Sequence, residues 1–442
     1  MNINNQYSVK PSGVPWLGDM PAGWRIGRLG GLYVHRNEKV SDKVFPPLSV
    51  TMKGVMPQLA TAAKSDDGEN RKLVRKGDFA INSRSDRRGS CGISAYDGSV
   101  SLINTILTPR GQMSPTYFNW LFHTDAFADE FYKWGHGIVD DLWTTRWSEM
   151  KRIVVVLPPL AEQRAIADYL DEKCGAIDAA IAEAKKGIEE YKAWKKSLIF
   201  EAVTGKRRVG AFNAKTQSRR EAEKMKHSGI PWIGAIPERW KLARLKNCAK
   251  VFGRIGFRGY TTADIVNEGE GALSLSPSNL KDIRMDYAKR TYISWSKYEE
   301  SPEIKVCKGD IVFVKTGSSY GKACIVDDMP CEATLNPQLV VLKCFSCHNR
   351  YLNYYLQTPL IKYQVELIVS GGTIPTMSQE KMGCWKIILP PLSEQQAIAD
   401  YLDDKCAAID AMVAEKEALI ADLEAYKKSL IYEVVTGKRE VA

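Results

Sequence analysis

LPPLAEQRAIADYLDEKCGAIDAAIAEAKKGIEEYKAWKKSLIFEAVTGKR, residues 157–207, is nearly repeated at residues 389–439 as LPPLSEQQAIADYLDDKCAAIDAMVAEKEALIADLEAYKKSLIYEVVTGKR. The two segments align without a gap, and 34 of the 51 aligned positions are identical. A shorter echo precedes each copy: SGVPWLGDMPAGWRIGRL begins at Ser12, and SGIPWIGAIPERWKLARL begins at Ser228. The chain is therefore a tandem duplication of one module.

Each long copy predicts one helix, because its apolar positions step by four and three, the spacing of a coiled-coil seam. In the first copy the seam residues are Leu170, Cys174, Ile177, Ile181, Ala184, Ile188 and Tyr191. In the second copy they are Leu402, Cys406, Ile409, Val413, Ile420 and Leu423, with Lys416 as an interruption. Both copies end at Thr-Gly-Lys-Arg, where the glycine suits a left-handed helix cap. About 44 residues from Ala161 predict a helix of about 65 Å.

A helix with one apolar seam needs a partner, and the nearest candidate is the second copy in the same chain. Residues 208–227 are basic and polar and serve only to return the chain to the second module. We therefore expect the two helices to pair antiparallel, with pseudo-twofold symmetry. Homodimerisation through the same seams is the alternative.

A second set of residues on these helices indicates a protein partner. Aromatic side chains occupy equivalent places in both copies, several of them off the seam: Tyr169 and Tyr401, Trp194 and Tyr426, Phe200 and Tyr432. Exposed aromatic residues on a helix are typical of a surface on which another protein packs. Because the set occurs twice, we expect two copies of one partner.

The regions between the repeats differ from each other and each predict an α+β domain. Strand-like runs cover Asp78–Asn82, Ile153–Leu157, Asp310–Val314, Leu339–Leu342 and Trp385–Leu389, and helix-like runs cover Pro115–Phe131 and Asn349–Val369. The predicted fold class is α+β, with two globular domains separated by two long antiparallel helices that form an intramolecular coiled coil. The predicted boundaries are 1–156 for the first domain, 157–207 for the first helix, 208–227 for the linker, 228–388 for the second domain and 389–442 for the second helix.

Two polar loops in each domain are candidates for nucleic-acid contact. SRSDRRGSCG from Ser83 and KTGSSYGKA from Lys315 follow strand-like runs that start at the Asp of a Lys-Gly-Asp sequence, and further glycine loops begin at Gly135 and Ser370. Basic and hydroxyl side chains on such loops can contact phosphates and base edges, although a solvated turn is the alternative for any single loop. The candidate DNA-binding residues are Arg84, Ser85, Arg87, Arg88, His136 and Arg146 in the first domain, and Lys315, Thr316, Ser318, Ser319, Tyr320, Lys322 and Thr373 in the second.

Composition and motifs argue against other classes of protein. The 442 residues carry a formal net charge of +10, which is compatible with a polyanionic partner, and they include no apolar run long enough to span a membrane. The start of the sequence has no export signal, so we expect a cytoplasmic protein without a membrane partner. The loop from Gly317 resembles a phosphate-binding loop one residue too short, and Cys344–His348 matches a haem-attachment pattern by chance. A zinc site at Cys331, Cys344, Cys347 and His348 is conceivable, but free thiols are preferred.

No methyltransferase motif of the Asn- or Asp-Pro-Pro-aromatic type is present, and the histidines offer no catalytic triad. We therefore expect no catalytic residue, no metal and no cofactor in this chain. A coiled-coil scaffold whose domains bind proteins, or a self-contained methyltransferase, would be the rival functions.

The order of variable domain, LPPLAEQRAIADYLD helix, variable domain and LPPLSEQQAIADYLD helix resembles the specificity subunit of type I restriction-modification systems over essentially the whole chain. The paired SG-x-PW-x-G starts also match that family. The resemblance implies that each variable domain reads one half of a bipartite, asymmetric DNA target and that the helices space these domains and dock two modification subunits. It also implies that S-adenosylmethionine, ATP and magnesium belong to partner subunits, namely the modification subunits and the translocase-nuclease (restriction) subunits.

Overall fold

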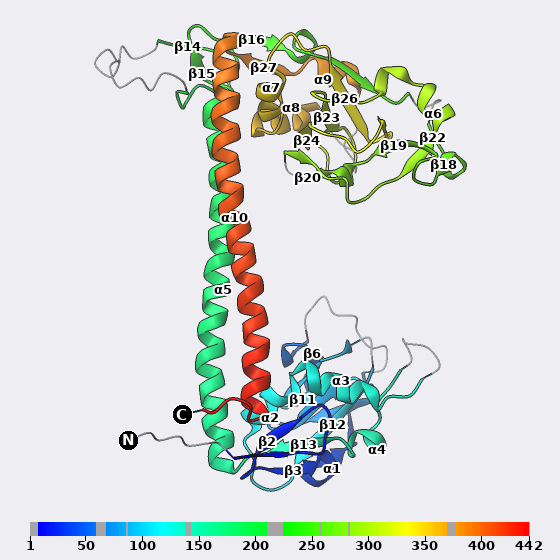
Figure 1. Cartoon of the computed structure of the whole chain (residues 1–442), viewed down its shortest axis with the longest axis vertical. Coiled ribbons are helices and arrows are strands. Elements are labelled where there is room, and N and C mark those ends of the chain that lie inside the picture. The colour runs from blue at the N-terminus through cyan, green and yellow to red at the C-terminus, as the bar shows by residue number, and fades with distance from the viewer. Residues whose placement is uncertain are drawn as a thin grey trace. The chain divides into compact units, whose positions relative to one another are not determined.

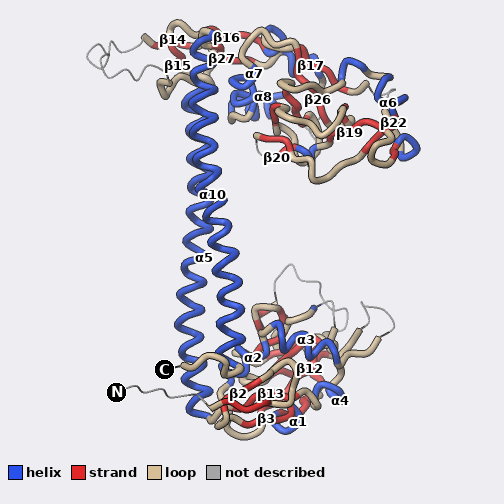
Figure 2. The backbone as a smooth tube through the Cα atoms, viewed as in Figure 1, coloured by secondary structure: helices blue, strands red, loops and turns tan. Residues whose placement is uncertain are grey.

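The computed structural model describes residues 8–58, 68–84, 87–137, 143–209, 224–255, 259–281, 283–368 and 377–441. The chain forms two compact units: residues 1–186 with 416–442, and residues 187–415. Each unit combines one α+β region with parts of both long helices (Figures 1 and 2). The division between the units therefore passes through the helices and not between the helices and the globular regions.

The first unit is built on a four-stranded antiparallel sheet in the order β10-β9-β12-β4. These strands are β4 (Tyr33–Arg36), β9 (Phe79–Asn82), β10 (Cys91–Ile93) and β12 (Asn104–Pro109). A three-stranded sheet has the order β11-β8-β5, formed by β5 (Lys39–Val40), β8 (Arg71–Val74) and β11 (Gly98–Val100). Strand pairs complete the unit: β1 (Val9–Pro11) with β2 (Asp19–Pro21), β3 (Arg25–Arg28) with β13 (Val154–Leu157), and β6 (Leu48–Thr51) with β7 (Gly54–Pro57). Its short helices are α1 (Leu29–Leu32), α2 (Pro115–Phe122), α3 (Asp125–Lys133) and α4 (Trp147–Met150).

The second unit repeats the four-stranded antiparallel sheet as β17-β26-β23-β24. These strands are β17 (Lys250–Gly253), β23 (Ile311–Val314), β24 (Ala323–Ile325) and β26 (Leu339–Lys343). A second sheet has the order β18-β22-β19-β25, formed by β18 (Ile265–Val266), β19 (Gly271–Leu275), β22 (Tyr292–Ser294) and β25 (Ala333–Leu335). Strand pairs are β14 (Met225–His227) with β15 (Ala235–Pro237), β16 (Lys241–Arg244) with β27 (Lys386–Leu389), and β20 (Leu280–Lys281) with β21 (Arg284–Met285). Its short helices are α6 (Trp295–Glu299), α7 (Asn349–Leu356), α8 (Pro359–Ile368) and α9 (Gln379–Gly383).

The two near-identical segments form helices α5 (Leu160–Val203) and α10 (Leu392–Val435), each 44 residues long. Six of the seven predicted seam residues of α5 are buried, and Tyr191 is half-buried. On α10 the first three seam residues are buried, whereas Val413, Ile420 and Leu423 are half-buried like the interrupting Lys416. The periodicity therefore predicted both helices and the faces that they bury.

Ion pairs within each unit show that the helices run antiparallel. In the first unit Lys427 Nζ lies 2.6 Å from Asp178 Oδ1, and Lys185 Nζ lies 3.9 Å from Glu424 Oε1, so higher numbers on one helix meet lower numbers on the other. In the second unit Lys195 Nζ lies 2.6 Å from Asp410 Oδ1. Lys195 precedes Lys427 by 232 positions, and Asp410 follows Asp178 by 232 positions. Both units therefore use the equivalent ion pair, with the two helices exchanged.

The repeated Glu-Gln sequence attaches the start of each long helix to the α+β region of its own unit. Trp24 Nε1 donates to Glu162 Oε2 at 2.6 Å in the first unit, and Trp240 Nε1 donates to Glu394 Oε2 at 2.9 Å in the second. The neighbouring glutamine side chains accept from backbone N–H groups just before helices α2 and α7. These contacts explain why the motif is kept in both copies.

The end of each long helix docks into the other module's α+β region. The buried Tyr117 hydroxyl donates to the Val435 carbonyl at 2.9 Å in the first unit. In the second unit the buried Tyr351 hydroxyl lies within hydrogen-bond distance of two carbonyl oxygens. These are Val203 O at 3.2 Å and Ile388 O at 2.7 Å. The hydrophobic core of the first unit thus includes the start of α5 and the end of α10. The core of the second unit includes the start of α10 and the end of α5.

The five predicted strands are confirmed to within one residue, but the two predicted helix-like runs are each broken into two helices. In the first unit Thr124 ends the run because its Oγ1 accepts from Phe127 N and caps a new helix. In the second unit Pro359 has no N–H to continue helix α7 and begins α8. Apolar periodicity continues across both breaks, so it could not reveal them.

Candidate nucleic-acid interface

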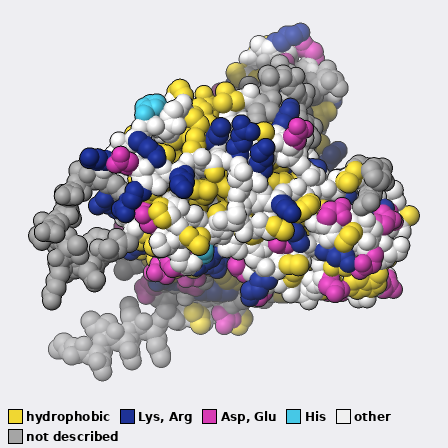
Figure 3. Space-filling view, turned by 90° about the horizontal axis from the view of Figure 1, so that it is seen from above, with side chains coloured by type: hydrophobic (Ala, Val, Ile, Leu, Met, Phe, Trp, Pro, Cys, Tyr) yellow, Lys and Arg dark blue, Asp and Glu magenta, His cyan; other side chains and the backbone are white. Residues whose placement is uncertain are grey.

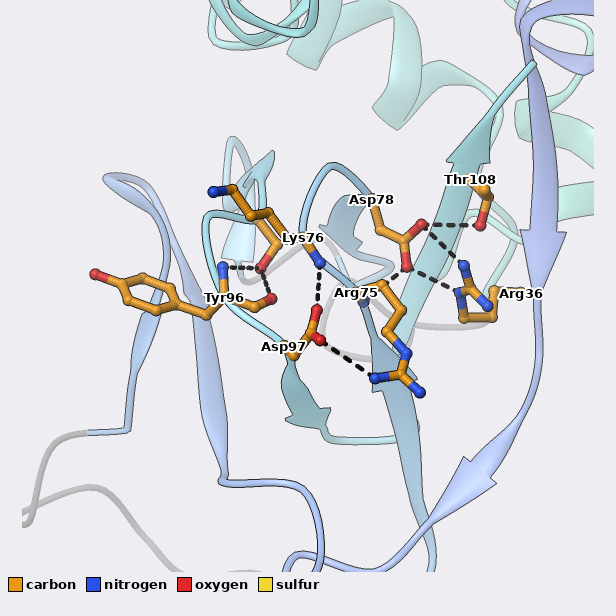
Figure 4. A network of polar contacts seen from close by, with 8 residues as sticks. Arg36, Arg75, Lys76, Asp78, Tyr96, Asp97 and Thr108 are labelled. Atoms are coloured by element: carbon orange, nitrogen blue, oxygen red, sulfur yellow. Dashed lines mark hydrogen bonds and ion pairs between the residues drawn. The ribbon is translucent and has the colours of Figure 1, made fainter. Parts of the chain in front are cut away.

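The Lys-Gly-Asp sequence positions the strand that leads into the first candidate loop of each unit. In the first unit Asp78 is almost fully buried and accepts hydrogen bonds from Arg36 Nε and Arg75 N, both at 2.8 Å, and from Thr108 Oγ1 at 2.8 Å (Figure 4). Gly77 before it has a φ of +90°, which a residue with a side chain rarely adopts. The carboxylate therefore ties the turn to strands β4 and β12.

The second unit uses the same arrangement with a different cation. Asp310 accepts from Cys307 N at 2.8 Å and pairs with Lys343 Nζ at 3.2 Å, and Gly309 has a φ of +87°. Burial raises the pKa of the Asp310 carboxyl, and the hydrogen bond from Cys307 N and the charge of Lys343 oppose that rise. The shared motif is thus a structural anchor, which the sequence pattern marked without indicating its role.

In the first unit the two candidate loops meet. Thr145 N donates to Ser83 O at 3.0 Å, and Thr144 exchanges backbone hydrogen bonds with His136. Thr144 also forms an isolated bridge with Arg84. The sequence placed Arg84 and His136 in separate loops, and the structure brings them to one edge of the unit.

The first-unit candidate side chains that the structure describes are exposed: Arg84, Arg87, Arg88, His136 and Arg146. Ser85 lies outside the described residues. Arg88 forms an ion pair with Asp129 of helix α3, so its charge is shared with the unit's own surface. Trp143 stacks on Tyr132 with ring centroids 5.7 Å apart.

In the second unit the two loops meet through the equivalent bond. Met377 N donates to Lys315 O at 3.1 Å, and each of these residues follows its first-unit counterpart by 232 positions. Lys315 N in turn donates to Gln338 O at 2.9 Å. Sequence analysis named Lys315 but missed Met377 and Gln338, although the constant offset could have pointed to Met377 as the counterpart of Thr145.

The second-unit candidates are less exposed than those of the first. Ser318 and Lys322 are exposed, and Lys315, Thr316, Ser319 and Tyr320 are half-buried, with Tyr320 packed against the core of the unit. Thr373 lies outside the described residues. Burial lowers the pKa of the Lys315 ammonium below its ordinary value. A half-buried cation of this kind gains most from an anion brought by a ligand.

The six aromatic candidates for partner binding fall into two groups. Trp194 and Tyr426 are 47% and 48% exposed at equivalent places on the two helices. The other four contact their own unit: Tyr432 donates its hydroxyl proton to Trp16 O at 3.0 Å, Tyr169 and Tyr401 lie against the cores, and Phe200 lies under Lys206 Nζ at 4.7 Å. Intramolecular packing therefore accounts for the repetition of these four.

The described residues hold no group of three His, Cys, Asp or Glu side chains placed to bind a metal. The loop from Gly317 connects strands β23 and β24 and does not lead into a helix, as a phosphate-binding loop must. In the part of the chain that the structure describes, none of the helices is both long and apolar enough to cross a membrane.

Comparison with known proteins shows what part of this chain is similar to. Residues 260–420 match the family described as Type I restriction modification DNA specificity domain. A putative type I restriction enzyme MjaX specificity subunit and the MjaVIII specificity subunit, both from Methanocaldococcus jannaschii, are 27% and 24% identical to this chain over 296 residues. The alignments cover 66% of this chain, and the chain spans 61% and 63% of the length of these two relatives.

Solved structures show the same fold. A chain from a study of complex assembly and conformational transition of the type I R-M system has a TM-score of 0.69 and 16% identity, covering 95% of this chain and 99% of that one. The HsdS subunit from Thermoanaerobacter tengcongensis has a TM-score of 0.51 and 16% identity, covering 95% of this chain and 98% of that one. The fold class and the resemblance inferred from the repeat are confirmed.

Proposed function

We propose, from the premise that residues 260–420 belong to the type I restriction-modification DNA specificity family, that each unit of this chain reads one half of a bipartite, asymmetric DNA sequence. The chain is a DNA-recognition component and not an enzyme. In the proposal it provides no chemistry of its own and directs the chemistry of partner subunits to a chosen site.

The observation that carries the proposal is the pair of loops in each unit. The same backbone hydrogen bond joins them, Thr145 N to Ser83 O in one unit and Met377 N to Lys315 O in the other. The side chains differ: the first unit presents exposed arginines, and the second presents lysines among hydroxyl groups. A common frame with different side chains is what two readers of different half-sites need.

The charge of the molecule agrees with a polyanionic ligand. On the face drawn in Figure 3, groups of Lys and Arg side chains are interspersed with acidic ones, and the whole chain has a net charge of +10. Phosphate contacts from such groups would supply most of the affinity and make it sensitive to salt. Sequence preference would come from the loop side chains that reach base edges.

The long helices are the proposed docking surface for two modification subunits. Trp194 and Tyr426 are exposed at equivalent positions, so one kind of partner could use both. S-adenosylmethionine would then belong to those partners, and ATP and magnesium to the translocase-nuclease subunits. The antiparallel pairing observed within each unit supports two equivalent docking places, one for each module.

The test is selection of bound sequences from random duplex DNA by the chain together with a modification subunit. The proposal predicts two enriched, unlike half-sites separated by an unread gap. A protein-binding scaffold would enrich no sequence, and a single continuous site would contradict two separate readers.

A charge-matched pair of variants shows whether the loops do the reading. Replacing Arg84, Arg87 and Arg88 by Gln is expected to lose or alter one half-site only. Replacing three exposed lysines of the same unit, Lys43, Lys76 and Lys133, by Gln removes equal charge and should leave both half-sites intact.

A further inference from the structure

The second unit contains an open cleft of about 340 Å³ between helix α7, helix α10 and the end of strand β24. We call it the α7–α10 cleft. The side chain of Asn353 on α7 forms part of its wall, and Cys406 and Ala407 on α10 lie opposite. None of the candidate DNA-binding or partner-binding residues lines it.

Asn353 is 3% exposed, and its buried Oδ1 has no hydrogen-bond partner in the described structure. The equivalent side chain of the first unit, Asn119 on α2, accepts from Ile93 N at 3.1 Å. Ile325 is the counterpart of Ile93 and lines the cleft, but it does not make this bond to Asn353. A buried carbonyl oxygen that lacks its partner is costly, and a donor from a ligand in the cleft would satisfy it.

The charged groups around the cleft favour a positively charged ligand. Asp327 and Asp404 are exposed at its rim, and neither forms an ion pair with another described residue. Arg350, by contrast, is held by Asp400 and Asp403, so its charge is already balanced. The other cation that lines the cleft is Arg284. Asp327 and Asp404 together with Arg284 therefore carry a net charge of one negative unit.

We propose that the α7–α10 cleft binds a small organic cation with N–H donors, of the diamine or guanidinium class. Its inner nitrogen would donate to Asn353 Oδ1, and its charges would lie between Asp327 and Asp404. An anion would meet the unsatisfied acceptor and the two carboxylates unfavourably. A bare metal ion is disfavoured because the described residues place no three acidic, His or Cys ligands together.

Isothermal titration calorimetry of the full chain with agmatine, at fixed ionic strength and without DNA, tests the site. Saturable binding is expected for agmatine and for putrescine, and none for tetramethylammonium, which carries charge but no N–H donor. Asn353→Leu and Asp404→Asn should each weaken agmatine binding by about tenfold or more. Because no DNA is present, the result does not depend on the proposed function.

Glu172→Gln is the matched control, since Glu172 stands at the first-unit position equivalent to Asp404 and should bind agmatine like the wild type. Asp404 lies on the surface, so its variant remains decisive if Asn353→Leu fails to fold as judged by circular dichroism. Equal binding of tetramethylammonium, or unchanged agmatine affinity in Asp404→Asn, overturns the proposal.

Discussion

Asp78 illustrates how a single buried charge holds the candidate interface in place. Its carboxylate joins the turn before β9 to two other strands of the sheet, so the direction of the loop after β9 depends on it. The neighbouring Asp97 also forms an ion pair, with Arg75 at 3.2 Å, but this pair is open to solvent (Figure 4). Both carboxylates pair with an arginine and accept from a backbone N–H, but Asp78 is buried and also accepts from Thr108 Oγ1.

Replacing Asp78 by Ala is expected to lower the free energy of unfolding by about 3 kcal/mol, because it leaves Arg36 and a backbone N–H without their acceptor. Chemical denaturation measures the loss. Asp97→Ala is the control and should cost clearly less, since water can replace its contacts. Equal losses in the two variants would show that burial of Asp78 is not what stabilises the turn.

Lys322 allows a test of phosphate contact, because it is exposed on the second-unit loop. Lys322→Gln should reduce the slope of log binding constant against log salt concentration by about one unit, with the preferred sequence unchanged. Binding measured across a salt series checks this. An unaltered slope combined with a changed base preference would reassign Lys322 from phosphate to base contact.

The C-terminal end of each long helix packs against the α+β region of the unit in which it lies. Gly437 follows α10 with a φ of +74°, and a side chain there would come within 2.3 Å of Pro21 Cδ. Gly234 has the same φ of +74°, but a side chain there would meet nothing within 4 Å. This pair separates backbone strain from packing of the helix end against the start of the module.

Gly234→Ala should cost about 1 kcal/mol through strain alone. Gly437→Ala should cost more, because the added methyl group displaces the helix end from Pro21 and Trp24. Thermal unfolding of the two variants gives the comparison. Similar losses would mean that the helix end is not tightly docked.

The elements also show how far sequence reasoning reaches. Both long helices and their buried faces could be predicted from the seam residues such as Leu170 and Leu402. Apolar residues that repeat every 3.5 positions lie on one face of a helix, and that face packs against a second helix. The breaks at Thr124 and Pro359 lay within apolar runs that continue on both sides. In each unit the two loops meet through a long-range backbone hydrogen bond, donated by Thr145 N in the first unit and by Met377 N in the second. No local sequence pattern encodes such a bond. The Oδ1 of Asn353 lacks the backbone donor that Ile93 N gives to Asn119 in the first unit, and the sequence, which has Asn and Ile at both places, does not distinguish the two.

At the scale of the whole molecule, the proposal assigns the helices the task of fixing the gap between half-sites. Inserting one helical turn, about 5.4 Å, at equivalent places in both α5 and α10 should lengthen the unread gap by one or two base pairs. The half-site sequences should stay the same. Selection from random DNA measures the gap, and an unchanged gap would reject the helices as its determinant.

If two unlike readers are held by antiparallel, near-identical helices, then making the readers alike should make the bound DNA sequence symmetric. The variant replaces residues 228–388 by a second copy of residues 12–156 and is used, with a modification subunit, to select sequences from random duplex DNA. The expected result is an inverted repeat in which the half-site of the first unit occurs twice around a gap. Selection of the original asymmetric target, or of two half-sites in the same orientation, would contradict it.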